Sequence, residues 1–170
     1  MKKILIVVDY QNDFVDGALG FDGARNLEDG ICKKIEEYSN DEVICTLDTH
    51  TEEYMSTHEG KRLPVPHCIK GTEGHKLFGR VRELLTDKKC FEKPTFPSLE
   101  MANYLAEGDY DVIELCGLVS NICVLSNAVM ARAACPDAEI IVDSSLTSAA
   151  DGEMHQKAMD ILRGIFVTVI

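Results

Sequence analysis

A cysteine at the junction between a predicted strand and a predicted helix is the first residue here with potential for covalent chemistry. Cys123 lies in the stretch Gly117–Val124 (GLVSNICV), after the apolar run Val112–Cys116 and before the small-residue-rich run Leu125–Cys135. Free N–H groups and the positive end of the helix dipole in a first helical turn favour a thiolate. The same N–H groups can hold an oxyanion once the thiolate attacks a carbonyl. The alternative for Cys123 alone is a buried, inert cysteine.

A carboxylate and an amine stand at the ends of two other predicted strands. Asp9 follows the apolar run Lys3–Val8, and Lys93 ends the short run Lys88–Lys93. An aspartate whose pKa is raised by partial burial can accept a thiol proton, and a nearby lysine stabilises thiolate and carboxylate together. Taken singly, Asp9 fits a loop-start aspartate better and Lys93 a solvated lysine. Together with Cys123 they form a candidate catalytic set of acid, amine and thiol.

A second cluster has the residue types of a metal site. Asp48 and His50 are two positions apart, so on an extended segment their side chains point to the same face. Glu59 and His67 follow in the polar segment Thr49–Lys70. Carboxylate and imidazole ligands suit Zn²⁺, Mn²⁺ or Fe²⁺, with positions left open for water or a pyridine-like nitrogen. The alternative is a set of polar loop residues that binds no metal.

Predicted strands and helices alternate along the whole chain. The runs that favour strands are Lys3–Val8, Glu42–Leu47, Lys88–Lys93, Asp111–Cys116, Glu139–Val142 and Phe166–Ile170. The runs that favour helices are Asn26–Tyr38, Gly71–Leu85, Ser98–Ala106, Asn121–Cys135 and Gly152–Arg163, and long loops are expected at Tyr10–Gly23 and Thr49–Lys70. This alternation predicts a three-layer α/β/α fold around a mostly parallel, doubly wound sheet of about six strands. Ligands of such sheets bind at the carboxyl ends of the strands, where Asp9, Asp48, Lys93 and Cys123 fall.

Length and composition narrow the class of protein. The 170 residues fit a single domain spanning residues 1–170, and 45% of them are hydrophobic. A net charge of −12 argues against binding to nucleic acid or to an anionic membrane. The apolar run Ile4–Val8 is too short for a signal sequence or a membrane span, so we expect a cytoplasmic protein. Seven cysteines without a CxxC pair suit a reducing compartment, and predict neither a disulfide framework nor a zinc ribbon.

The residues of the candidate catalytic set resemble those of the isochorismatase-like cysteine hydrolases. The segment Asp9–Phe14 (DYQNDF) resembles the D-x-Q-N-D-F opening of that family. Lys93 stands where their catalytic lysine stands, and Gly117–Val124 matches the segment that bears their nucleophile, with Cys123 in that place. The resemblance extends from Lys3 to about Ala150 and implies the isochorismatase-like hydrolase fold.

Within that family, the polar loop is similar to that of the nicotinamidases. Their Asp-x-His pair reads here as Asp48-Thr-His50, and their later histidine, with a lysine-glycine-threonine stretch after it, reads as His67–Thr72. Glu59 falls where some nicotinamidases have a further metal ligand, and isochorismatases proper lack the whole set. The resemblance therefore implies one divalent ion at Asp48, His50, His67 and Glu59, with zinc expected first and manganese or iron as alternatives.

The resemblance also implies an activity, the hydrolysis of nicotinamide to nicotinate and ammonia in NAD salvage, with pyrazinamide as a second substrate. The ring nitrogen would face the metal, Asp9 would take the proton of the Cys123 thiol, and water would hydrolyse the resulting thioester. The oxyanion would be held by the backbone N–H groups of Ser120 and Cys123. The resemblance also implies a cis peptide bond just before the nucleophile, which in this chain would join Val119 to Ser120.

The candidate walls of the substrate site are Phe14, Phe96 and Val119. Ser120-Asn121 replaces the Thr-Asp of many nicotinamidases, and Met55–Thr57 replaces their Ser-Phe. These departures leave open a related cysteine hydrolase of another small amide or carbamoyl compound. A homo-oligomer is also left open.

Two alternative functions that involve no hydrolysis remain for this sequence. A receiver-like signalling domain fits Asp9, Asp48 and Lys93-Pro94 superficially, but it has no use for the histidines or the strand-end thiol. A redox-sensing thiol without turnover is the other.

Overall fold

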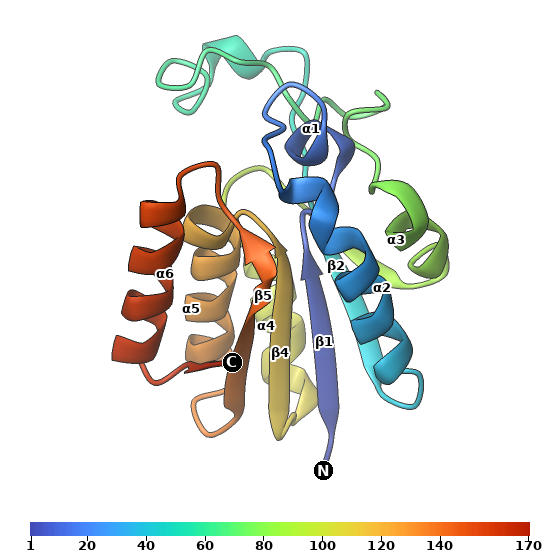
Figure 1. Ribbon diagram of the computed structural model, residues 1–170, viewed down its shortest axis with the longest axis vertical. Helices are drawn as coiled ribbons and strands as arrows, with labels where there is room; N and C mark the ends of the chain where they lie inside the picture. Colours follow the sequence, from blue (N-terminus) through green and yellow to red (C-terminus); the bar gives the residue numbers. More distant parts are fainter.

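A single parallel sheet forms the centre of the molecule (Figure 1). The computed structural model describes residues 1–170. Its strands are β1 (Lys3–Val8), β2 (Glu42–Asp48), β3 (Lys89–Lys93), β4 (Val112–Leu118), β5 (Glu139–Ser148) and β6 (Thr168–Val169). The strand order is β3-β2-β1-β4-β5-β6, and every neighbouring pair runs parallel. The predicted six-stranded parallel α/β architecture is confirmed.

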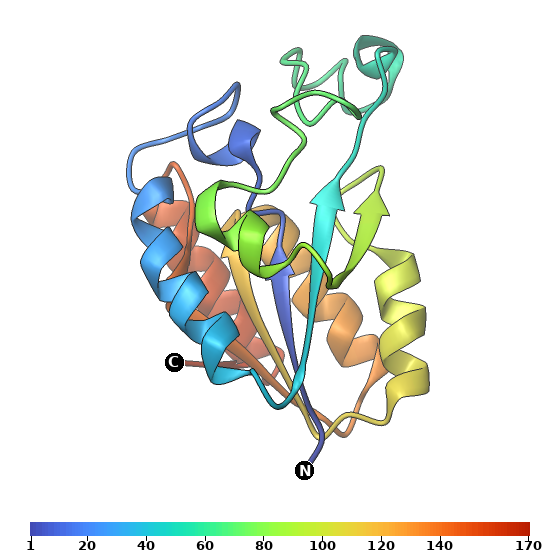
Figure 2. The same ribbon diagram turned by 90° about the vertical axis from the view of Figure 1, so that its right-hand side faces the viewer.

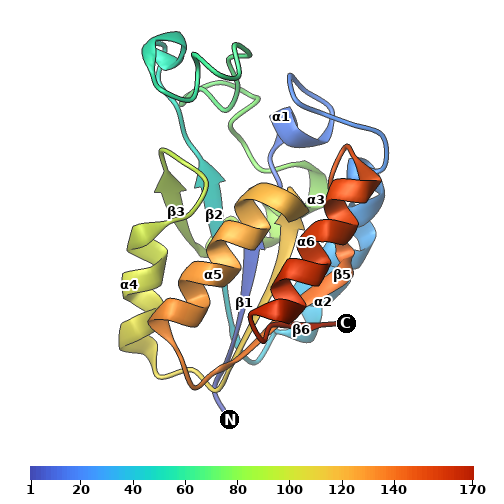
Figure 3. The same cartoon turned by 90° about the vertical axis from the view of Figure 1, so that its left-hand side faces the viewer.

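Helices cover both faces of the sheet, as Figures 2 and 3 show from opposite sides. The α-helices are α1 (Asn12–Val15), α2 (Glu28–Glu37), α3 (Gly79–Leu84), α4 (Leu99–Gly108), α5 (Leu125–Ala134) and α6 (Gly152–Gly164). Short 3-10 helices span Ala24–Leu27 and Tyr54–Ser56, and a π-helical turn spans Ser120–Val124. Helices α2 and α3 pack on one face, and α4, α5 and α6 pack on the other. No helix combines the length and the apolar character needed to cross a membrane.

The central strand β1 supplies side chains to two separate cores. Ile4, Ile6 and Val8 face the core under α4, α5 and α6, and Leu5 and Val7 face the core under α2 and α3. All five side chains are fully buried. A strand buried on both faces needs a continuous apolar run rather than alternation, which is the pattern that KILIVV shows.

The helix predicted at Gly71–Leu85 is wrong over its first half. Helix α3 begins only at Gly79, because the preceding backbone pairs with the segment after β1. The amides of Asn12 and Asp13 donate to the carbonyls of Lys76 and Gly74. This tertiary pairing outweighs the apolar spacing that favoured a helix there. The segment Tyr10–Gly23, expected to be only loop, contains α1.

One pair of cysteines is joined, although the scattered cysteines predicted no disulfide framework and suited a reducing compartment. Cys45 on β2 and Cys90 on β3 are register partners with Cα atoms 4.5 Å apart, and the structure joins them as a disulfide. They are 45 residues apart in the sequence, so cysteine spacing along the chain could not reveal a pair that only the strand register creates.

Candidate active site

The predicted catalytic residues meet above the carboxyl ends of the strands. Asp9 directly follows β1, Lys93 is the last residue of β3, and Cys123 lies in the π-helical turn after β4. Asp48 ends β2 and is the register partner of Lys93 on the neighbouring strand. Residues that are far apart in the sequence therefore share one end of the sheet, as the parallel arrangement predicts.

Lys93 lies between the acid and the thiol. Its side chain is 1% exposed, and its Nζ is 2.6 Å from Oδ2 of Asp9 and 3.6 Å from Sγ of Cys123. The same Nζ is 3.5 Å from Oδ1 of Asp48 and donates a hydrogen bond of 3.0 Å to the carbonyl of Thr95. Burial alone would lower the pKa of Lys93, but the surrounding anionic groups, first of all Asp9, raise it above its usual value. The amine is thus held in its charged form.

Asp9 is placed to accept a proton. It is fully buried, has a φ of 45°, and its Oδ1 accepts a hydrogen bond of 2.7 Å from Thr46 Oγ1 on β2. Burial raises the pKa of Asp9, an effect that Lys93 partly offsets and Asp48 reinforces. A carboxylate with a raised pKa is a better general base than an ordinary aspartate.

The resting state of Cys123 differs from the expectation. Burial and the nearby Asp9 carboxylate raise the pKa of the Cys123 thiol well above its usual value, although Lys93 opposes the shift. The proximity of a helix end was expected to favour thiolate, but the side chain is only 4% exposed and faces a carboxylate. These surroundings favour the thiol over the thiolate, so a base is needed to remove the proton before the sulfur can attack.

A carboxylate and two imidazoles form a compact cluster beside this set. Oδ2 of Asp48 is 3.0 Å from Nε2 of His50 and 3.2 Å from Nε2 of His67. Asp48, His50 and His67 are buried, and their ligand atoms lie within 4.8 Å of one another. Oε1 of Glu59 is 3.7 Å and 3.6 Å from the same two nitrogens. His67 Nδ1 lies 2.8 Å from the carbonyl of Val65, a contact that leaves its Nε2 free for a metal.

The ligand types of this cluster fit a divalent cation. Two neutral imidazole nitrogens with one or two carboxylate oxygens are a common set for zinc, manganese or iron. Tyr54 is fully buried against both rings, with centroids 4.7 Å from His50 and 5.0 Å from His67, and so fixes their orientation.

Two polar residues of the opening motif support the cluster, and the sequence analysis gave them no role of their own. Gln11 is fully buried, donates to the Asp48 carbonyl at 2.9 Å and accepts from the Asp48 amide at 2.8 Å. Its side-chain amide also donates to the carbonyl of His75 at 2.7 Å. Asp13 accepts from the amide of Cys68, next to His67, at 2.7 Å. The only signal for these roles was the motif itself.

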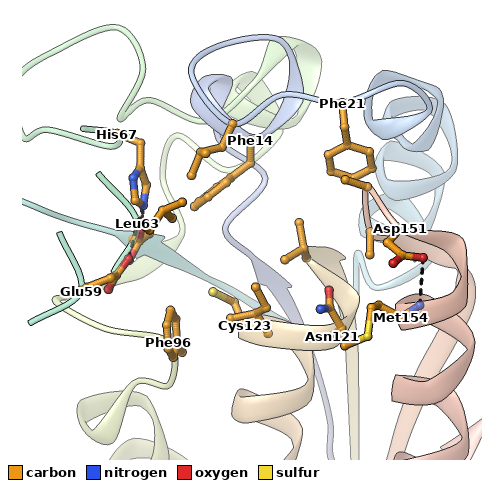
Figure 4. Close-up of a pocket in the computed structure, with 16 residues that line it drawn as sticks. Phe14, Phe21, Glu59, Leu63, His67, Phe96, Asn121, Cys123, Asp151 and Met154 are labelled. Carbon is orange, nitrogen blue, oxygen red and sulfur yellow. Dashed lines mark hydrogen bonds and ion pairs between the residues drawn. The ribbon is translucent and has the colours of Figure 1, made fainter. Parts of the chain in front are cut away.

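A cavity of about 280 Å³ opens above Cys123 (Figure 4). The three predicted walls line it, Phe14 with its ring 5.6 Å from that of His67. Glu59 and His67 lie at one side of Cys123, and Asn121, Asp151 and Met154 lie at the other. No pattern in the sequence indicated eight further lining residues, which are Leu19, Phe21, Leu63, Ile122, Ala149, Ala150, Asp151 and Met154.

Backbone donors gather at the turn that carries Cys123. The amides of Val119, Ser120 and Asn121 donate to no acceptor within the protein. The cis peptide of this segment joins Leu118 to Val119, one bond earlier than predicted, at the point where β4 ends. His155 on α6, also missed, has its Nδ1 3.0 Å from Oγ of the fully buried Ser120.

Comparison with known proteins places this site in a family. Residues 3–170 match the Isochorismatase domain. PncA, an isochorismatase family protein of Bacillus subtilis (strain 168), is 35% identical over 145 residues, which cover 76% of this chain and 78% of that protein. The crystal structure of nicotinamidase PncA from Bacillus subtilis shares 30% identity and a TM-score of 0.88, with 99% of both chains covered. Pyrazinamidase/nicotinamidase from Streptococcus mutans UA159 shares 27% identity and a TM-score of 0.88, over 99% of this chain and 100% of that one. The chain belongs to the isochorismatase family and is a nicotinamidase-like amidohydrolase.

Proposed function

We propose that this protein is a metal-dependent nicotinamidase that converts nicotinamide to nicotinate and ammonia through a thioester on Cys123, a reaction of NAD salvage. The observation that carries the proposal is the meeting of an acid, an amine and a thiol, with Nζ of Lys93 2.6 Å from Asp9 and 3.6 Å from Cys123, beside a cluster of metal-ligating groups in one cavity.

The metal site would be formed by Asp48, His50 and His67, with Glu59 as a fourth residue within reach of both imidazoles. A divalent ion held by these residues would supply a Lewis acid for an electron-rich ring nitrogen. Phe14 and Phe96 would pack against the ring, since both line the cavity. With the ring held at one end of the cavity, the carboxamide would lie over the Cys123 thiol at the other. This positioning lowers the entropic part of the activation barrier for attack.

The first half of the reaction forms the thioester. Asp9 accepts the proton of the Cys123 thiol, and the sulfur attacks the carboxamide carbon. The N–H groups of Ser120 and Cys123 donate to the resulting oxyanion, and the Lys93 ammonium stabilises the charges around it. Asp9 returns the proton to the leaving nitrogen, the C–N bond breaks and ammonia departs.

The second half releases the acid. Asp9 takes a proton from water, and the hydroxide attacks the thioester carbonyl. The C–S bond then breaks, and Asp9 returns its proton to the sulfur. The nicotinic acid that forms ionises to nicotinate, and the released ammonia takes up that proton as ammonium. The thiol and the carboxylate are regenerated, so the cycle needs no further reactant.

An ammonia-release assay with purified, metal-supplemented protein tests the proposal. Nicotinamide and pyrazinamide are expected to be hydrolysed, and Cys123→Ala is expected to release no ammonia while it keeps the fold by circular dichroism. Turnover by Cys123→Ala would show that another group is the nucleophile. A wild-type protein that hydrolyses neither nicotinamide nor pyrazinamide would refute the proposed choice of substrate.

A second candidate substrate is a larger amide or carbamoyl compound. The cavity continues past Cys123 to Asn121, Asp151 and Met154, on the side away from the metal-ligating cluster. At this end the Asn121 amide and the Asp151 carboxylate could bind a polar substituent of a larger substrate, a group that nicotinamide does not have. A panel of carbamoyl compounds in the same assay separates the two candidates by their kcat/KM values.

A further inference from the structure

One buried amide side chain outside the catalytic set connects the nucleophile turn to the loop after Lys93. Asn127 on α5 is fully buried, and its Nδ2 donates to the carbonyl of Cys123 at 2.8 Å. The same Nδ2 donates to the carbonyl of Phe96 at 3.2 Å, and Oδ1 accepts from the amide of Ser98 at 2.9 Å. A single side chain thus binds three backbone groups on two different segments.

One of these segments carries the Cys123 sulfur, and the other follows the residue that carries the Lys93 amine. The π-helical turn holds the sulfur, and the loop that begins after β3 holds the amine, because Lys93 Nζ also donates to the Thr95 carbonyl at 3.0 Å. The loop also carries Phe96, which lines the cavity beside Cys123 (Figure 4). The separation of 3.6 Å between Lys93 Nζ and Cys123 Sγ therefore depends on how the two segments are fixed to each other.

No other hydrogen bond joins this loop to the turn. Ser126, the residue before it, donates from Oγ to the carbonyl of Ile122 at 2.6 Å, but this bond stays inside one helical segment. Ser98 uses its own hydroxyl to cap α4, where it accepts from the amide of Met101. Because buried backbone groups need partners, loss of the Asn127 amide would leave the loop free to shift.

We propose that Asn127 is a positioning residue for the hydrolysis. It fixes the turn that bears Cys123 against the loop that follows Lys93, and so sets the alignment of thiol and amine. Misplacement of reacting groups by about 1 Å can cost about 100-fold in rate. The expected effect of losing this link is therefore on the chemical step more than on substrate binding.

Two substitutions test the link, one that removes all three hydrogen bonds and one that keeps only the bond within the turn. Asn127→Ala removes all three hydrogen bonds. Asn127→Ser can still donate to the Cys123 carbonyl one turn back, but its side chain is too short for Phe96 and Ser98. Both variants are expected to lower kcat for nicotinamide by about 100-fold with a smaller change in KM. Ser126→Ala is the matched control, since it removes a bond to the same turn and leaves the loop attached.

Alkylation by iodoacetamide gives a readout that does not require turnover. The rate at Cys123, after subtraction of the Cys123→Ala background, is expected to fall in both Asn127 variants and to stay at the wild-type value in Ser126→Ala. This arm is independent of the proposed substrate, whereas the kcat arm rests on it. A wild-type protein inactive on nicotinamide would therefore refute the proposed function and leave the alkylation test of Asn127 in force.

Three results would overturn the inference. The first is a folded Asn127→Ser protein with wild-type kcat and alkylation rate, which would make the link to the loop irrelevant. The second is an equal loss in Ser126→Ala, which would trace the effect to any loosening of the turn. The third is an Asn127→Ala protein whose kcat loss matches its fraction unfolded in thermal melts, with normal alkylation of the folded part.

Discussion

Lys93 is a buried cation with two carboxylates and the Cys123 sulfur close to its amine. Its Nζ contacts Asp9 at 2.6 Å and Asp48 at 3.5 Å, and the sulfur of Cys123 lies at 3.6 Å. A buried ion pair that loses one partner leaves an uncompensated charge, which is strongly unfavourable. In the proposed mechanism the lysine would stabilise two groups, the carboxylate that acts as the base and the negative charge that develops on the sulfur when its proton leaves.

Substitution of Lys93 should affect both activity and stability. Lys93→Ala is expected to lower kcat by about 100-fold or more, because the charges that develop on the thiolate and the oxyanion lose their nearest cation. The same change should destabilise the fold by about 3–5 kcal/mol, since Asp9 loses its buried partner. Steady-state kinetics and urea unfolding measure the two effects. An effect confined to KM would contradict a role in the chemistry.

The metal-ligating side chains should bind their ion jointly. Asp48→Ala combined with His50→Ala removes two of the three groups that lie within 4.8 Å of one another. We expect the double variant to lose bound divalent metal, as measured by elemental analysis after dialysis against metal-supplemented buffer. His58→Ala is the matched control, because that histidine is exposed and lies outside this cluster. Wild-type protein that retains no metal under these conditions would contradict the metal-dependent mechanism.

At the scale of elements, the short segment after β1 connects the strand ends to the long polar loop. Gln11 bonds to both backbone groups of Asp48, and Asp13 holds the amide of Cys68. The loop returns to the end of β2 through a bridge between His50 and Ile69. A 22-residue polar stretch, Thr49–Lys70, is thereby tied at several points to regular structure and can present His67 to Asp48.

The support that Gln11 gives to the cluster can be measured as metal affinity. Gln11→Ala should weaken divalent-metal binding by about 10–100-fold, a common cost of removing groups that orient metal ligands. Asn12→Ala is the matched neighbour, since the Asn12 side chain is partly exposed and bonds to the Glu73 carbonyl instead. Titration with a chelator under competition gives the affinities. Equal affinity in the Gln11→Ala and wild-type proteins would show that Asp48 is held by its strand alone.

Asp9 and Asp48 could be predicted from the sequence because each stands directly after an apolar run, and Lys93 because it ends a short strand-like run. The side chains that bind segments distant in the sequence could not be predicted in this way. Gln11, Asn127 and His155 bind backbone or side-chain atoms of elements far along the chain, and such contacts leave no local pattern. The helix expected at Gly71–Leu85 failed for a related reason, since pairing with the segment after β1 overrode the apolar spacing.

At the scale of the whole molecule, stability depends on two cores that share the central strand. Ile6 is fully buried in the core beneath α4, α5 and α6. Ile6→Ala is expected to lower the free energy of unfolding by about 2–5 kcal/mol, through lost burial and the cavity left behind. Ile161→Ala on α6 is the control, because that side chain is 53% exposed and its change should fall within about 0.5 kcal/mol. Urea titrations that gave equal losses would contradict the assignment of the cores.

The strand order has a consequence for how such a protein can change its substrate. The chain leaves β1 toward α2 on one face and leaves β4 toward α5 on the other, although β1 and β4 are neighbours in the sheet. This divergence opens a crevice at the strand ends that exists whatever side chains line it. The location of the binding cleft is thus inherited from the winding of the chain. A change at a rim residue such as Asn121 or Met154 would alter the lining of the cavity that receives the acyl group, while the sheet and the sulfur stay where they are.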